Sequence, residues 1–362
     1  MPQIDHWEEA GELPRDIWKK MAKMDYFKIH VPENQGGLGL DFGYVVVFLE
    51  ELNKCNSAGF AASIGAHAFL AMPHLLEEGS DYIKKKYLIP ASNGEKIGCL
   101  AITEPNTGSD VSAIKTHASK TKDGYVFNGS KTFITNGVLS DFLVVAAKTN
   151  LDAGYNGISL FLLDRNMKGI TSSPLKKLGW HASDTAEIQL DQVAIPNENR
   201  IGEENKGFYY IMQRFSLERL ILAIGAIASS EHALDYALQY MGEREAFGRN
   251  LNKFQELRHR VAQLASEIEA NKYFNYHICR DYGSGKSLVN ECSMAKLLST
   301  QLAEKVMYQC LQFFGGYGYM EEYKIARMFR DSRIGTIGGG TSEIMKEIIS
   351  KTVIDNQRMA NA

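Results

Sequence analysis

Hydrophobic positions change their spacing twice along this chain. Between about residues 17 and 96 they recur at the three- and four-residue intervals of an amphipathic helix. The clearest set is Phe42, Val45, Val46, Phe48, Leu49 and Leu52. From residue 97 to about 201 the apolar residues gather in short runs rich in β-branched and aromatic side chains, and from residue 206 the helical spacing returns. The pattern predicts a helical segment, a β segment and a second helical segment.

The β segment carries turn signals between its apolar runs. Asp123-Gly124, Asn128-Gly129 and Asn156-Gly157 are pairs that favour tight hairpins, so the strands that they join are expected to be antiparallel. We therefore predict an α+β chain of three domains. They are an N-terminal α-helical domain at residues 1–96, a middle antiparallel β domain at 97–204 and a C-terminal helical bundle at 205–362.

Composition excludes several classes of protein. A net charge of −3 over 362 residues gives no basic field for nucleic acid. The five cysteines are scattered and form no CxxC pair, so we expect neither a disulfide framework nor a metal site, and a reducing compartment. The longest apolar run, Leu220 to Ala228, is too short for a membrane span, and residues 1–10 lack the features of a signal or transit peptide. We expect the bacterial cytoplasm or, in a eukaryote, the mitochondrial matrix.

The segment from Leu100 to Asp110 has residues suited to a flavin ring. Thr103 and Ser109 could bind the polar edge of the ring, while Leu100 and Ile102 could contact its face. An ordinary turn capped by Asp110 explains the same residues equally well. Taken alone, the segment leaves both interpretations open.

A second segment, Lys131 to Gly137, repeats this chemistry. Strand alternation places Phe133 and Thr135 on one face. A plain hairpin closed by Asn136-Gly137 is the alternative, and it does not exclude a flavin contact.

These two segments, together with Gly202–Met212 and Thr341–Ile348, have the order and spacing found in the acyl-CoA dehydrogenase family, which the chain resembles over its whole length. It looks closest to the long-chain branch. The resemblance implies an N-terminal helical domain, a middle β domain, a C-terminal four-helix bundle and FAD bound between them. It also implies a homotetramer, a dimer of dimers, and electron transfer to an electron-transferring flavoprotein. Met1 falls late in the family's first helix, so that helix is expected to be largely missing.

The resemblance also implies roles for individual residues. Around the isoalloxazine ring and the adjoining acyl-CoA it places Leu100, Ile102, Thr103, Gly108 and Ser109. Against the other side of the ring it places Phe133, Ile134 and Thr135, with Thr135 near flavin N5. Toward the FAD of a neighbouring subunit it places Arg244, Phe247 and Gln255, and against the adenosine diphosphate part it places Gln312, Phe313, Gly315 and Gly316. The cofactor set ends with Thr341, Ser342 and Glu343, and the acyl-CoA set includes Ser109, Ser216, Leu217, Arg219 and Gly340.

The family's usual catalytic glutamate is missing, because Gly339 stands at its position in the C-terminal loop. In the family reaction this glutamate removes the α-proton of the thioester while flavin N5 takes a hydride from the β-carbon. Gly339 cannot act as a base, although its backbone N–H could still donate to the thioester carbonyl.

Glu218 is the predicted replacement. Within a helix it shares a face with Phe215, Ile221 and Leu222, which should desolvate the carboxylate and raise its pKa, as suits a general base. A surface glutamate paired with Arg214 explains the helix pattern alone. Long-chain and isovaleryl members of the family, however, have their base at this position and a small residue in the loop.

Other candidate groups rank lower. Glu104 is expected to brace the flavin loop, and Glu343 to interact with a helix dipole. His181 has no Asp or Ser partner at a recognisable spacing, so a hydrolase triad is unsupported.

The predicted function is therefore FAD-dependent oxidation of a long-chain acyl-CoA to a trans-2-enoyl-CoA, with Glu218 as the base. The alternatives are an isovaleryl or branched short-chain dehydrogenase, a flavoenzyme of the same fold that uses oxygen, and a non-catalytic homologue that only binds acyl-CoA or flavin.

Overall fold

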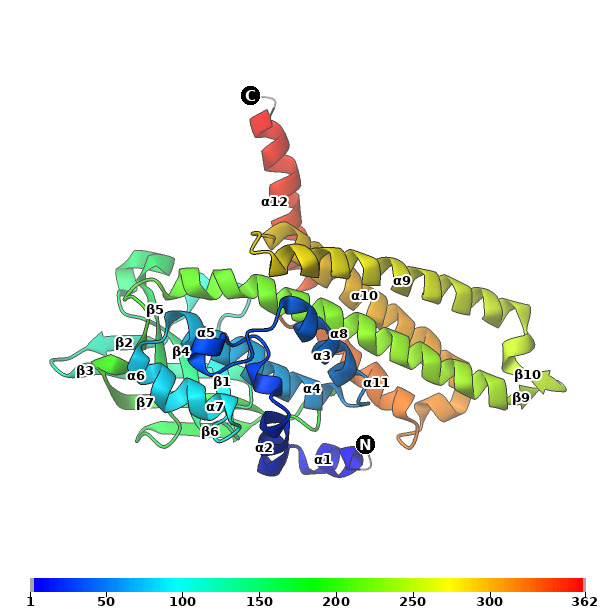
Figure 1. Cartoon of the computed structure of the whole chain (residues 1–362), viewed down its shortest axis with the longest axis horizontal. Coiled ribbons are helices and arrows are strands. Elements are labelled where there is room, and N and C mark those ends of the chain that lie inside the picture. Colours follow the sequence, from blue (N-terminus) through cyan, green and yellow to red (C-terminus); the bar gives the residue numbers. More distant parts are fainter. Residues whose placement is uncertain (1–2, 361–362) are drawn as a thin grey trace.

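The computed structural model describes residues 3–360 and consists of helices, a β-sheet and a second set of helices (Figure 1). Residues 1–2 and 361–362, the outer ends of the first and last predicted domains, lie outside the described residues. The predicted borders at 96/97 and 204/205 fall in the loops before the first strand and before the longest helix.

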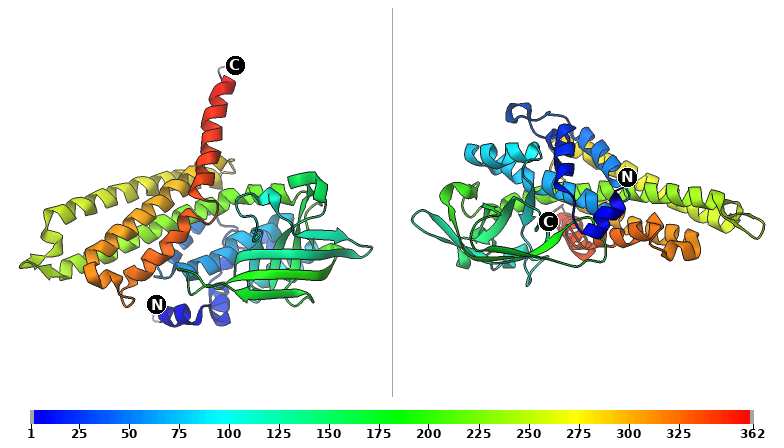
Figure 2. Two further views of the ribbon diagram at one scale, coloured as in Figure 1. Left: turned by 180° about the vertical axis from the view of Figure 1, so that it is seen from behind. Right: turned by 90° about the horizontal axis from the view of Figure 1, so that it is seen from below.

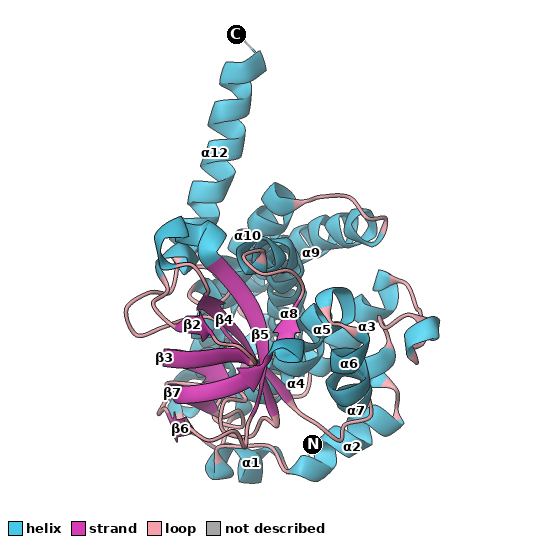
Figure 3. Cartoon of the chain, turned by 90° about the vertical axis from the view of Figure 1, so that its left-hand side faces the viewer, coloured by secondary structure: helices cyan, strands magenta, loops and turns pink. Residues whose placement is uncertain are grey.

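The N-terminal helices pack on one side of the sheet (Figure 3). They are α1 (Ile4–Ala10), α2 (Arg15–Lys23), α3 (Phe42–Asn53), α4 (Ala58–Gly65), α5 (Met72–Glu78), α6 (Asp81–Ile83) and α7 (Ile89–Ser92). Side chains mark two of the starts, because Asp41 accepts a hydrogen bond from Gly43 N and Ser57 accepts one from Phe60 N. A π-helical turn at Ala66–Ala71 joins α4 to α5.

The continuous helical segment Ala58–Glu78 is long and apolar enough to cross a membrane, but 89% of its most apolar window is buried inside the protein. It packs against β1 and α8, which is the position of a core helix. The sequence pattern did not single this segment out.

The middle β-sheet has the strand order β6-β7-β3-β2-β4-β5-β8, with β1 added beside β4. Its strands are β1 (Gly98–Ala101), β2 (His117–Lys120), β3 (Gly124–Thr135), β4 (Phe142–Lys148), β5 (Ile158–Asp164), β6 (Ile170–Pro174), β7 (Thr185–Pro196) and β8 (Arg200–Ile201). The pairs β2–β3 and β4–β5, joined at Asp123-Gly124 and Asn156-Gly157, are antiparallel as predicted, and β6–β7 is antiparallel as well. The third predicted turn, Asn128-Gly129, is wrong, because it lies inside β3 at a register shift against β7.

One strand departs from the predicted antiparallel arrangement, because β1 pairs with β4 in parallel, with Gly98 opposite Phe142. β2 makes a further short parallel pairing with β4, at His117 and Lys148. Turn dipeptides report only the strands that they connect directly. They carry no information on β1, whose partner β4 is the third strand after it along the chain.

The C-terminal part is a helical bundle. It contains α8 (Gly207–Glu243), α9 (Gln255–Gly283), α10 (Val289–Phe314), α11 (Lys324–Ser332) and α12 (Ser342–Ala360). A short hairpin of β9 (Glu245–Ala246) and β10 (Arg249–Asn250) caps the bundle at the end away from the sheet (Figures 1 and 2). α8 packs against both α3 and α10, and α12 projects from the body of the protein. This arrangement leaves α8 between the N-terminal helices and the rest of the bundle.

Candidate functional site

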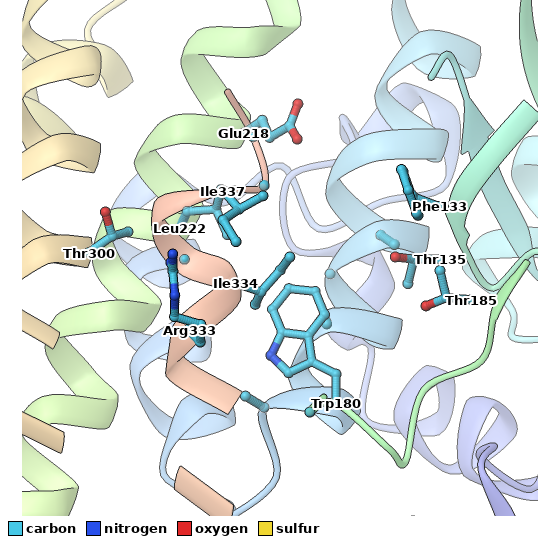
Figure 4. A pocket seen from close by; sticks show the side chains of 18 of the residues that line it. Phe133, Thr135, Trp180, Thr185, Glu218, Leu222, Thr300, Arg333, Ile334 and Ile337 are labelled. Atoms are coloured by element: carbon cyan, nitrogen blue, oxygen red, sulfur yellow. The ribbon is translucent and has the colours of Figure 1, made fainter. Parts of the chain in front are cut away.

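A cavity of about 1020 Å³ lies where the three parts of the chain meet. Its walls come from α3 and α4, from the loops that follow β1 and β6, from the end of β3, and from α8, α10 and the loop between α11 and α12. Figure 4 shows part of this cavity, with Glu218 across it from Phe133 and Thr135.

Glu218 faces the cavity from α8 and is half-buried. Burial raises the pKa of its carboxyl above the ordinary value, and the charges of Arg219 and Lys296 oppose that rise. Phe215 and Leu222 line the cavity from the same face of the helix, as expected. The surface alternative is not what the structure shows, because Arg214 donates instead to Glu78 Oε1 at 2.6 Å.

Gly339 lies directly beside Glu218. Its φ of +63° is in the left-handed region, which favours glycine. A Cβ atom on Gly339 would lie 3.5 Å from Glu218 Oε1 and 2.3 Å from Leu222 Cδ1. The Glu218 carboxylate therefore occupies the region into which a side chain at position 339 would extend.

The two predicted flavin segments meet on the opposite wall of the cavity. All eight of their predicted residues line it, namely Leu100, Ile102, Thr103, Gly108, Ser109, Phe133, Ile134 and Thr135. A register shift in β3 between Lys131 and Ile134 places Phe133 at a φ of +59°, with 71% of the residue exposed. An aromatic residue rarely adopts this backbone conformation, and here it presents a large apolar ring to an internal cavity.

A buried ion pair fixes the first of these segments, and the sequence identified only one of its members. Glu104 accepts hydrogen bonds from Lys115 N at 2.6 Å and Thr116 N at 2.9 Å. Lys131 Nζ donates to Glu104 Oε1 and to Ile102 O, both at 2.9 Å. Burial alone would raise the pKa of Glu104, but the Lys131 charge and these hydrogen bonds hold it below its usual value. Glu104 therefore braces the loop, as predicted.

Sequence reasoning missed a second brace, made by Trp180 and Asp331. Trp180 lines the cavity with a φ of +57° (Figure 4), and its backbone N–H donates to Asp331 Oδ1 at 2.7 Å. Asp331 Oδ2 accepts from Ala58 N at 3.1 Å, and burial raises the pKa of Asp331 to about 6. Asp331 lies about 150 residues from Trp180 along the chain, so no local pattern could connect them.

Some residues of the expected acyl-CoA and cofactor sets do not line this cavity. Ser216 and Leu217 are buried in other directions, because successive helix residues are turned by about 100° and only Phe215, Glu218 and Arg219 of this turn reach the cavity. Gly340 and Thr341 line it, whereas Ser342 and Glu343 do not.

The residues expected to reach a neighbouring subunit gather at the far end of the bundle. A second cavity of about 580 Å³ is lined by a set that includes Arg244, Gln312, Phe313, Gly315 and Gly316. Phe247 is 96% exposed near the β9–β10 hairpin, and Gln255 is exposed at the start of α9. None of these residues lines the first cavity, so their contact with a partner's cofactor stays a prediction.

Comparison with known proteins gives one consistent picture. Models of the N-terminal, middle and C-terminal domains of acyl-CoA dehydrogenase match residues 1–95, 99–193 and 205–354. The long-chain specific acyl-CoA dehydrogenase of Sus scrofa mitochondria is 38% identical, over 99% of this chain and 83% of its own length. The mitochondrial isovaleryl-CoA dehydrogenase of Oryza sativa is also 38% identical, over 97% of this chain and 86% of its own length.

Two further relatives extend the comparison. The subunit CarC of the caffeyl-CoA reductase–Etf complex of Acetobacterium woodii is 36% identical, over 96% of this chain and 92% of its own length. The crystal structure of an acyl-CoA dehydrogenase from Geobacillus kaustophilus superposes with a TM-score of 0.94 and 40% identity, covering 98% of this chain and 93% of the other.

Proposed function

The chain belongs to the acyl-CoA dehydrogenase family, and on that premise we propose that it oxidises long-chain acyl-CoA thioesters to trans-2-enoyl-CoA, with Glu218 as the base that removes the α-proton. Flavin-dependent dehydrogenation is the activity of the family, and the enzyme is an oxidoreductase with FAD as its cofactor. The chain length and the identity of the base are the new elements of the proposal.

The first cavity suits FAD. The ring of Phe133 stands exposed at the cavity wall, and Trp180 adds a second aromatic side chain. The hydroxyls of Thr103, Ser109 and Thr135 can hydrogen-bond to the polar edge of a flavin. FAD held there would supply the acceptor for the hydride from the β-carbon.

The neighbouring positions of Glu218 and Gly339 carry the assignment of the base. An α-proton next to a thioester is weakly acidic, so its removal needs a desolvated base within reach and a donor for the developing enolate oxygen. The Glu218 carboxylate is half-buried, faces the cavity and has a raised pKa. Within the described residues, no oxygen accepts a hydrogen bond from Gly339 N–H. This N–H therefore remains available to a ligand.

The walls of the cavity beyond Glu218 favour a long, straight acyl chain. Small residues form one wall along α4 and its π-helical turn, namely Ala58, Ala61, Ala62, Gly65 and Ala66. Opposite them, α8 contributes Leu222, Gly225, Ala226 and Ser229. At 1.5 Å per helical residue, the wall from Glu218 to Ser229 is about 16 Å long. A short branched acyl group would leave much of this length unfilled.

Anaerobic titration of the FAD-loaded enzyme with acyl-CoAs tests the proposal. The series runs from butyryl-CoA to palmitoyl-CoA and includes isovaleryl-CoA, with flavin absorbance as the readout. We expect prompt bleaching that is strongest with the long chains. Bleaching by isovaleryl-CoA alone would reverse the chain-length assignment, and no bleaching by any member would refute the dehydrogenase proposal.

Gly65→Phe should shorten the preferred acyl chain. Gly65 is buried and lines the cavity, and a Cβ atom there would meet nothing within 4 Å, so the first atom of a new side chain has room. Excluding three or four methylenes of a long substrate, at about 0.8 kcal/mol each, should lower kcat/KM for palmitoyl-CoA by about a hundredfold. Activity with butyryl-CoA should change little.

Gly65→Ala is the matched control, because its single methyl leaves most of the space open. The measurement is kcat/KM for the two substrates in the wild type and both variants. Unchanged palmitoyl-CoA activity in Gly65→Phe would show that the acyl chain does not follow this wall.

We also propose that electrons pass to an electron-transferring flavoprotein and that the enzyme is a homotetramer, a dimer of dimers. The first proposal is supported by the likeness to CarC, a subunit of a complex with Etf. The second is supported by Arg244, Gln312 and Gly316, which line the second cavity at the exposed end of the bundle. Light scattering of the purified holoenzyme gives its mass, and a monomer would contradict the second proposal.

A further inference from the structure

Lys296 is a buried cation that contacts the loop of Gly339 and Gly340. It lies on α10 with no exposed surface, and its Nζ donates to Gly340 O at 2.6 Å. Burial lowers the pKa of Lys296 to about 8, against the opposing charge of Glu218. An ammonium group inside a protein is costly unless acceptors and negative charges surround it. The groups that surround Lys296 therefore indicate its role.

The hydrogen bond from Lys296 fixes the loop that carries Gly339. Gly339 and Gly340 have φ angles of +63° and +88°, so the loop is built from two consecutive left-handed glycines. Glycine pairs have access to many other conformations, and a single strong anchor restricts them. Thr300, one turn further along α10, donates its hydroxyl to Lys296 O at 2.7 Å and also lines the cavity. The anchor thus belongs to a helix that itself forms part of the cavity wall.

Lys296 is also one of the two cations that act on Glu218. The other is Arg219, which follows Glu218 on α8 and donates to Ser293 Oγ on α10 at 3.3 Å. The negative charges of Glu343 at the start of α12 and of Glu304 on α10 act on Lys296 in turn, and both raise its pKa. No sequence motif pointed to Lys296, because it stands in an ordinary helical pattern some 80 residues from Glu218.

We propose that Lys296 is a positioning residue for this reaction, which holds the Gly340 carbonyl so that Gly339 stays beside Glu218 and keeps a positive charge at the loop next to that carboxylate. The inference rests on the proposed role of Glu218 as the base. Lys296 acts through the loop and the carboxylate, without contact to the reacting carbons.

Three variants of the FAD-loaded enzyme separate the two effects of Lys296. Lys296→Met removes both the charge and the donor, Lys296→Gln keeps a donor without the charge, and Lys296→Arg keeps the charge. The measurements are the single-turnover rate of flavin reduction across pH and amide hydrogen exchange of the segment around residues 338–340.

We expect Lys296→Met to slow flavin reduction near pH 7 by about tenfold or more. Loss of the cation raises the pKa of Glu218 further, so the base is protonated over a wider range and the acid limb of the rate profile moves to higher pH. Exchange at the loop should accelerate. Lys296→Gln should move the acid limb of the rate profile but keep amide hydrogen exchange at the loop slow. Lys296→Arg should leave the acid limb where it is in the wild type.

An unmoved acid limb together with unchanged exchange in Lys296→Met would overturn the inference. If Lys296→Met does not fold, an acid limb that stays in place in Lys296→Gln has the same meaning. Glu218→Gln, measured in parallel, keeps the two proposals distinct. Normal turnover in that variant refutes the base itself, whereas loss of turnover with unaffected Lys296 variants refutes only the positioning role.

Discussion

Glu218→Gln is expected to slow the reduction of bound FAD by acyl-CoA about 10²- to 10⁴-fold, the range for loss of a positioned general base. Glutamine fills the same space on α8 but cannot accept the α-proton. The FAD should stay bound, because the proposed flavin contacts lie on the opposite wall, at Thr103, Ser109, Phe133 and Thr135. Stopped-flow flavin absorbance under anaerobic conditions measures the rate.

The pH dependence gives the same prediction a second readout. Burial raises the pKa of Glu218 above 4.5, its ordinary value, so the base loses its charge at a higher pH than a free glutamate would. The wild-type rate should therefore fall as pH decreases through that raised pKa. Glu218→Gln should be slow at every pH and lack this limb.

Glu269→Gln is a suitable control, because Glu269 is exposed on α9 and lines neither cavity. It should reduce its flavin at the wild-type rate. Near-normal turnover in Glu218→Gln would rule out this residue as the base.

Gly339→Glu distinguishes the dehydrogenase from a homologue that binds acyl-CoA without catalysis. If the chain had simply lost its base, restoring a glutamate in the loop would create activity. We expect no gain, because in our proposal Glu218 already supplies the base, and its Oε1 would lie 3.5 Å from the new Cβ. A rise in turnover in this variant would favour the non-catalytic alternative.

Lys131→Met should destabilise the protein by about 3–5 kcal/mol, the usual cost of leaving one member of a buried ion pair without its partner. Lys131 and Glu104 are both buried, and the pair joins the second half of β3 to the loop after β1. Both of these segments line the proposed flavin site, so weaker retention of FAD should accompany the loss of stability. Urea unfolding of the FAD-free and FAD-loaded protein separates the two effects, because FAD stabilises only the folded state.

The acid sensitivity of the variant follows from Glu104. Its pKa in the folded protein lies below the ordinary value of 4.5, so its contribution to stability is present above pH 4.5 and is lost as pH falls through the lowered pKa. Without Lys131 that pKa should rise toward the ordinary value, so the stability of the variant should depend less steeply on pH below 4.5 through this group.

Lys120→Met is the matched control, because Lys120 pairs with Glu204 at the exposed surface. Such pairs contribute about 1 kcal/mol or less. Equal unfolding midpoints for Lys131→Met and Lys120→Met would show that the buried pair does not brace the loop.

Local patterns in the sequence determined much of this protein. The helical periodicity at Phe42 to Leu52 and the turn pair Asp123-Gly124 depend only on near neighbours in the chain. The structure has α3 and the β2–β3 hairpin at these places. The resemblance to a family, which preserves order and spacing, also pointed to the two proposed flavin segments, Glu218 and Gly339, and the structure places all of them around one cavity.

Only the tertiary structure decided which distant groups meet. Four contacts join segments that are far apart in sequence. They are the parallel pairing of β1 with β4, the ion pair of Glu104 with Lys131, the hydrogen bond from Trp180 N–H to Asp331, and the hydrogen bond from Lys296 to Gly340 O. The same holds for Ser216 and Leu217, which the exact rotation of α8 turns away from the cavity. Burial and pairing of charges depend on the packing of whole elements, and short-range sequence patterns encode only how each element forms.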